Sequence, residues 1–149
     1  MPSADPLTAD PPSHLVPRTA RIHGWGGCRS VPVQLLEPAG TEFLPEVVRQ
    51  SGAAGRGAIA RGMGRSYGDA AQLEGGLVVQ MTQCRSFELD PARGTVTAQA
   101  GVTLGELLAA LVPAGWMLPV VPGTQHVSVG GAIANSGSPG RTMGTLRGS

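Results

Sequence analysis

The chain has 149 residues and a formal net charge of +1, which suits one domain or a part of a larger one. Such a small charge excludes binding that depends on a clustered basic surface, so we expect no nucleic-acid partner. Glycine is unusually common, with 23 residues, and its clusters between apolar runs favour loops whose bare backbone approaches a ligand.

Residues 1–20 are rich in proline, serine, threonine and aspartate and have no periodicity, so we expect a disordered leader. They show no basic start followed by an apolar core, and no apolar run in the chain is long enough to span a bilayer. We therefore expect no signal peptide, no transmembrane segment and a cytoplasmic location. Cys28 and Cys84 form no CxxC pair and the three histidines are far apart, so we expect reduced thiols and no metal site.

The first predicted element is a helix over Leu44–Gly55, with Thr41 as a candidate N-cap and Gly52 as a candidate terminator. Three strands are predicted after it, over Gly57–Arg61, Gly76–Met81 and Gly94–Gly101.

The clearest helix is predicted over Val102–Gly115, because Thr103 and Glu106 have the spacing of a capping box before a leucine-rich face. A further helix is expected to open at the pair Gly130 and Gly131. The order helix, three strands, two helices indicates an α/β or α+β fold.

The strand over Gly57–Arg61 leads into the stretch ARGMGRSYGD, which holds Gly62, Gly64 and Gly68. A diphosphate needs several backbone N–H donors that converge, and glycine allows the tight bends that aim them. Ser66 adds a hydroxyl donor, and Arg61 or Arg65 is available to offset charge. The spacing matches neither the dinucleotide fingerprint GxGxxG nor a P-loop, so a plain tight loop remains the alternative.

A second glycine-rich stretch, PVVPGTQHVSVGGAIANSG, covers Pro119–Gly137 and leads into the predicted last helix. Two such loops at the ends of structural elements are able to grip one elongated anionic ligand. The alternative is two unrelated turns in a glycine-rich protein.

Together, GWGG near the start, GRSYGD, AGVTLGELL and PGTQHVSVGGAIA resemble the FAD-binding half of the vanillyl-alcohol-oxidase type flavoenzymes. Within that family the likeness is greatest to the decaprenylphosphoryl-ribose oxidases, and it runs over residues 21–135. The resemblance implies an α+β fold (an α/β sandwich), namely the N-terminal portion of a PCMH-type FAD-binding domain. It also implies that the family's substrate domain would lie beyond Ser149.

The resemblance implies FAD as the cofactor, bound by both loops. In the first loop it implies the binding residues Ala60, Arg61, Gly62, Met63, Gly64, Arg65, Ser66, Tyr67, Gly68, Asp69 and Ala70, and in the second Gly123, Ser128, Val129, Gly130, Gly131 and Asn135. For Asp69, bracing the loop is as reasonable as contacting the ligand. No catalytic residue is assigned.

After Asn135 the chain departs from the family, which has a histidine where this sequence has Ser138. The resemblance then implies FAD held without a covalent bond. A neighbouring reading frame of suitable codons for Pro139–Met143 encodes the Gly-Lys-Asn-His that the family carries here. We therefore expect residues 136–149 to be a divergent tail, with an out-of-frame origin as the hypothesis.

For the intact enzyme the resemblance implies hydride transfer from a sugar alcohol carbon to FAD, in the epimerisation of a cell-wall arabinan precursor. The implied partners are a polyprenyl-phosphate sugar and a nicotinamide-dependent reductase, and membrane association of the intact enzyme is a further expectation from the family. Two alternatives remain for this chain: a catalytically dead remnant that binds FAD weakly or not at all, and a generic α/β domain for small ligands. Whether the chain is itself an enzyme is left open at this stage.

Overall fold

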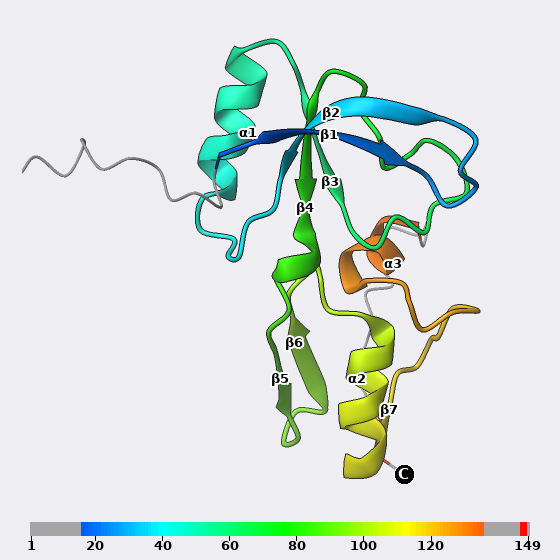
Figure 1. Ribbon diagram of the computed structural model, residues 1–149. Helices are drawn as coiled ribbons and strands as arrows, with labels where there is room; N and C mark the ends of the chain where they lie inside the picture. The colour runs from blue at the N-terminus through cyan, green and yellow to red at the C-terminus, as the bar shows by residue number, and fades with distance from the viewer. Residues whose placement is uncertain (1–15, 136–146, 149) are drawn as a thin grey trace, which may run out of the picture.

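The computed structural model describes residues 16–135 and 147–148 and has two parts, a twisted sheet with a helix and a smaller hairpin-and-helix unit (Figure 1). The sheet has the strand order β1-β2-β4-β3, with β1 antiparallel to β2 and the other pairs parallel. Its elements are β1 (Arg18–His23), β2 (Ser30–Leu36), α1 (Leu44–Ala53), β3 (Ala58–Arg61) and β4 (Leu77–Gln80).

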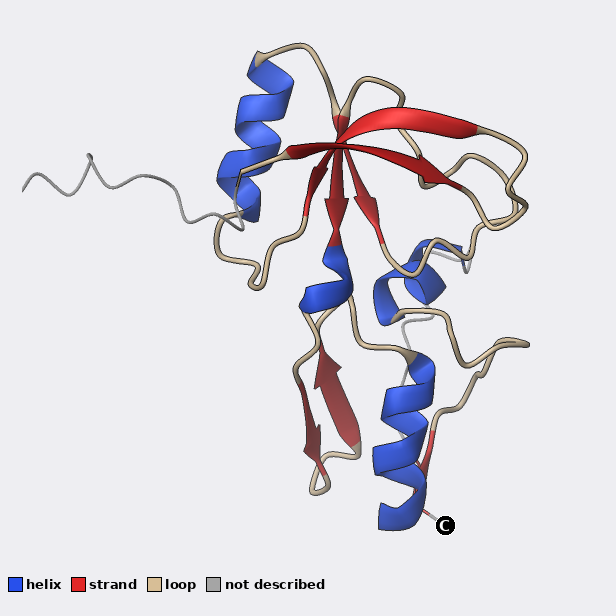
Figure 2. Ribbon diagram, in the orientation of Figure 1, coloured by secondary structure: helices blue, strands red, loops and turns tan. Residues whose placement is uncertain are grey.

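The smaller unit follows β4 in the chain (Figure 2). It contains the antiparallel hairpin of β5 (Phe87–Asp90) and β6 (Thr95–Ala98), the helices α2 (Leu104–Leu111) and α3 (Val129–Asn135), and the short pair β7 (Trp116–Met117) and β8 (Arg147–Gly148). Single 3-10 turns lie at Met81–Gln83 and Val112–Ala114. The mixed helix and strand content confirms the α+β fold class.

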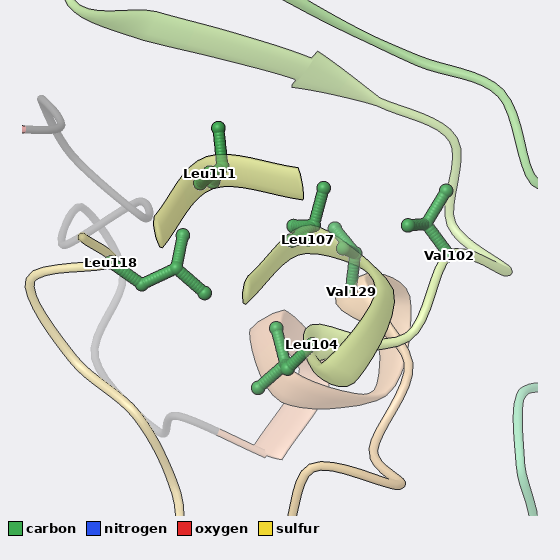
Figure 3. Close-up of a cluster of buried hydrophobic side chains, with 6 residues drawn as sticks. All are labelled: Val102, Leu104, Leu107, Leu111, Leu118 and Val129. Carbon is green, nitrogen blue, oxygen red and sulfur yellow. The ribbon is translucent and has the colours of Figure 1, made fainter. Parts of the chain in front are cut away.

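Strand β4 is covered on both faces. Successive side chains of a strand point to opposite sides, so neighbouring residues of β4 pack against different elements. Val78, fully buried, packs with Val33 and other residues of β2, whereas Val79 packs with Leu44 and Val47 of α1. A separate cluster holds the smaller unit together and consists of Val102, Leu104, Leu107, Leu111, Leu118 and Val129 (Figure 3). The protein therefore has apolar packing on each side of the junction that follows β4.

The capping box predicted for α2 is confirmed, and it fixes where this helix starts. The Thr103 hydroxyl accepts a hydrogen bond from the Glu106 amide at 3.2 Å, and the Glu106 carboxylate accepts one from the Thr103 amide at 2.8 Å. The Thr103 hydroxyl also donates a hydrogen bond to the Glu106 carboxylate at 2.7 Å. This bond, the one from the Thr103 amide and that from Arg85 hold the pKa of Glu106 below its usual value. The helix is shorter than predicted and ends in a 3-10 turn at Val112–Ala114.

Helix α1 begins at Leu44 as predicted, but its N-cap was predicted wrongly. Thr41 makes no side-chain cap; its carbonyl accepts from the Leu44 amide at 3.2 Å, and Phe43 occupies the N-cap position. The proline in the first turn already removes one amide that would need a cap. Gly52 lies inside the helix rather than at its end, and the chain turns away at Gly55, which has a φ of +66°.

The two N-terminal strands, β1 and β2, and the later strand β5 were also missed. Residues 18–20, expected in the leader, belong to β1. Residues 1–15 and the part of the expected tail from 136 to 146 lie outside the described residues.

We expect Gly101→Ala to destabilise the junction between the two parts. A Cβ there would overlap the Met81 carbonyl oxygen and come within 2.7 Å of the Cys84 carbonyl oxygen. Because both obstacles are backbone atoms, the loss should be about 1–3 kcal/mol in the free energy of unfolding. Gly52→Ala, in an exposed helical position with no atom within 4 Å, is the matched control and should stabilise by about 0.5–1 kcal/mol. Urea unfolding of both variants measures the difference, and equal effects would contradict the argument.

Candidate functional site

The first glycine loop, residues 62–71, leaves the C-terminal end of β3 (Figure 1). This end of a parallel strand is where α/β folds commonly place ligands. Beyond the loop, Leu73 packs against the cluster that contains Val78, so the return of the chain is anchored in the sheet core. The loop is thus held at both ends while its middle, residues 66–70, is exposed.

Four carbonyl groups of the first glycine loop, those of Gly62, Ser66, Asp69 and Ala71, accept hydrogen bonds from the protein. The oxygens of Gly62, Ser66 and Asp69 accept hydrogen bonds from Gln80 Nε2, the Trp25 amide and the Gln72 amide, at 2.7, 3.1 and 3.0 Å. Within residues 16–135, by contrast, no protein group accepts a hydrogen bond from a backbone N–H of residues 63–69. The loop therefore leaves a run of donors available to another molecule or to water, as an anion-binding nest requires of its donors.

Arg61 braces the first glycine loop across its base. Its guanidinium donates to the Ala71 carbonyl at 2.9 Å and to the His23 carbonyl at 2.8 Å. Burial lowers the pKa of this guanidinium, and a Cβ on Gly64 would overlap it. Gly64 also has a φ of +62°, a conformation that side chains disfavour. Of the two arginines available to offset charge, Arg61 is therefore already engaged in holding the loop.

Arg65 lies over the ring of Trp25, with its guanidinium carbon 4.5 Å from the ring centroid. Its Nε atom is buried and has no hydrogen-bond partner in the described part of the chain. The segment that carries Trp25 lies close against the loop, since a Cβ on Gly24 would approach the Gly68 carbonyl oxygen to 2.5 Å. This cation–π pair keeps a positive charge beside the loop.

The second glycine-rich stretch meets the first loop at Ser128. A Cβ on Gly62 would overlap the Ser128 hydroxyl oxygen, so the two predicted bends are neighbours. The first amides of α3 are used internally: Val129 donates to the Val102 carbonyl at 2.7 Å and Gly130 to the Ala100 carbonyl at 2.9 Å. Residues 128–131 thus form a fixed surface beside the first loop, which we call the wall, and the amides of residues 129–131 are not free to donate to a ligand.

The remaining predicted site residues differ in their surroundings. Asp69 accepts a hydrogen bond from Gln72 Nε2 at 2.8 Å, which supports its local bracing role. Tyr67 is 87% exposed. Gly123 and Asn135 are exposed as well, and a Cβ on Gly123 would have no neighbour within 4 Å.

Sequence reasoning missed the residues that support the loops from elsewhere. His23, Trp25, Gln80 and Ala100 contact the site from strands or segments distant in sequence. Among these four residues, Trp25 lies in the GWGG motif and Ala100 opens the AGVTLGELL motif, so only these two had a signal in the sequence. In the described part of the chain, no group of side chains suited to a metal ion occurs, and no helix has the length and apolar character needed to cross a bilayer.

Comparisons with known proteins identify the family and the fold of this chain. Residues 32–148 match the family described as FAD binding domain. Decaprenylphosphoryl-beta-D-ribose oxidase of Mycolicibacterium smegmatis is 44% identical over 117 residues, which cover 77% of this chain and 25% of that protein. A solvent-stable cholesterol oxidase has a TM-score of 0.72 at 24% identity, over 83% of this chain and 24% of its own. Wild-type BBE-like 1 of Physcomitrella patens has a TM-score of 0.66 at 23% identity, over 80% and 29%.

We expect Arg61→Met to loosen the first glycine loop, because both carbonyls that the guanidinium holds would lose their donor. Hydrogen exchange of the Trp25 and Gln72 amides, which donate to the loop carbonyls of Ser66 and Asp69, should become faster, whereas the β5–β6 hairpin should exchange as before. Arg49→Met is the control, since Arg49 is exposed and pairs with Glu46 on its own helix. Unchanged exchange of the Trp25 and Gln72 amides in the Arg61 variant would contradict its bracing role.

Proposed function

Because the chain belongs to the FAD binding domain family and has the fold of the PCMH-type flavin oxidases, we propose that its two glycine loops bind FAD between them. The observation that carries the proposal is the run of unengaged amides at residues 63–69, beside the wall formed at Ser128. Converging N–H donors are what the diphosphate of a dinucleotide requires. The fit is good, because donors, a nearby positive charge and close backbone approach occur together.

The proposed roles follow from the surroundings of each residue. In the first loop, the amides of residues 63–69 and the hydroxyl of Ser66 would donate to the diphosphate, with Arg65 supplying positive charge. Arg61 acts indirectly, by holding the loop. In the second stretch, Gly123 and residues 128–131 would lie beside the flavin. Met63, Tyr67, Asp69 and Asn135 complete the proposed set, with Ala60 and Ala70 at the ends of the first loop.

The whole protein's activity is part of the same proposal. The relative with 44% identity bears the name of a decaprenylphosphoryl-ribose oxidase, and this supports a polyprenyl-phosphate sugar as the substrate of the corresponding oxidase. FAD, when bound, supplies a ring that accepts a hydride from an alcohol carbon. The residues described here would hold and orient the cofactor, and a nicotinamide-dependent reductase would act as the partner. The chain spans about a quarter of the length of that relative, so substrate contacts are assigned to none of its residues.

We expect the purified chain to bind FAD, and Gly64→Ala to weaken that binding. The substitution strains a positive φ and displaces Arg61, so the dissociation constant should rise about tenfold or more. Quenching of flavin fluorescence during a titration measures it, with Gly52→Ala as the control that should bind like the unchanged chain. If the unchanged chain binds no FAD at micromolar concentration, the proposal fails.

We further expect the bound FAD to be released on denaturation, because Ser138 stands where the resemblance places the histidine that would be joined to the flavin. After precipitation with acid, the yellow colour should remain in the supernatant. Flavin that stays with the precipitated protein after washing would contradict non-covalent binding.

A further inference from the structure

We propose that the Ser128 hydroxyl is the spacer that sets the distance between the two FAD-binding loops, matched to the missing Cβ of Gly62. The inference rests on the proposed function and deepens it, because it identifies Ser128 as a positioning residue rather than a ligand of the cofactor. It starts from one contact: the hydroxyl oxygen occupies the place where a side chain at position 62 would begin.

The Ser128 side of this contact is rigid. The residue is 1% exposed, and its hydroxyl oxygen accepts a hydrogen bond from the Gly131 amide at 3.2 Å. Its backbone pairs with Thr103 in an antiparallel bridge, and the next amide, that of Val129, donates to the Val102 carbonyl at 2.7 Å. Ser128 is thereby fixed to the core of the smaller unit and has little freedom to move aside.

The Gly62 side is fixed as well. Gly62 directly follows the register pair of Arg61 with Gln80, and its carbonyl accepts from Gln80 Nε2 at 2.7 Å. Its φ is not among the positive values found at seven other glycines. Glycine is therefore required at position 62 for space and not for backbone conformation, and the space is taken by Ser128.

Two rigid partners in direct contact behave as one unit. If the side chain at position 62 or 128 becomes larger or smaller, the distance between the two loops has to change, since the hydrogen bonds on both sides resist local adjustment. The affinity for a cofactor that contacts both loops would then change, even though neither of these side chains touches the cofactor. Removing the hydroxyl should then make room for a methyl group at position 62, whose Cβ would lie 3.4 Å from the Ser128 Cβ, an ordinary contact.

The test is a double-mutant cycle in the full chain, with Gly62→Ala, Ser128→Ala and the combined variant, each titrated with FAD. Gly62→Ala should weaken binding about tenfold or more, as expected for overpacking against a fixed neighbour. Ser128→Ala should weaken binding by only a few-fold, through the lost hydrogen bond to Gly131. The combined variant should bind about as well as Ser128→Ala alone, which is strong non-additivity.

A matched cycle uses Gly68→Ala in place of Gly62→Ala, because a Cβ on Gly68 would meet no atom within 4 Å. Its effect should add to that of Ser128→Ala instead of being relieved by it. The visible absorption band of the bound flavin is a second readout, since general destabilisation lowers the bound fraction without moving the band. We expect Gly62→Ala to shift this band and the combined variant to restore it.

If the effects of Gly62→Ala and Ser128→Ala on FAD affinity are additive, the proposed spacer role of Ser128 is wrong. If Gly62→Ala is insoluble, recovery of soluble, FAD-binding protein in the combined variant supports the spacer, and its failure overturns it. If the unchanged chain binds no FAD, the proposed function fails by itself. The spacer role of Ser128 is then tested by the melting temperatures of the variants. The combined variant must melt at a higher temperature than Gly62→Ala alone.

Discussion

The site depends on how the carbonyl groups of the first glycine loop are held. Four carbonyls of this loop accept hydrogen bonds from the protein, whereas the amides of residues 63–69 donate to no group in the described part of the chain. Arg61, Gln80 and the Trp25 amide supply three of the donors, from β3, β4 and the segment after β1. The charged guanidinium matters most, because hydrogen bonds from charged groups contribute about 1.5–3 kcal/mol each, roughly twice the neutral value. The donors of the loop are thus organised by the strands behind it.

The second constraint is the placement of the two parts of the protein relative to each other. The first loop is anchored through Leu73 in the sheet core, whereas Val129, beside Ser128, belongs to the core of the smaller unit. A pair of backbone hydrogen bonds from α3 to the connection between β6 and α2 makes the second wall part of that unit. The affinity for the proposed cofactor should therefore depend on the packing of both hydrophobic cores. Mutations far from the loops, such as those at the junction between the two parts, should alter that affinity.

The sequence was informative wherever the determining interaction is local. The capping box at Thr103 involves residues three apart, and the glycine loops were recognisable from their own composition. The register of β1 and β2, the stacking of Arg65 on Trp25 and the bonds of Arg61 all join distant segments. No composition or periodicity signal carries such pairings, because each depends on how the chain folds back. The N-cap prediction for α1 failed for a different reason, since a proline in the first turn lacks an amide that a side-chain cap would bind.

The glycines of the two loops also separate into distinct physical classes. Gly64 is required by its positive φ, and Gly62 by the atom that occupies its side-chain position. Gly68 and Gly123 have neither reason, since a Cβ on either would meet open space and neither has a positive φ. The fold of the chain alone does not account for glycine at these two positions. Close approach of a bound molecule to bare backbone would account for it, and both lie in the stretches proposed to bind FAD.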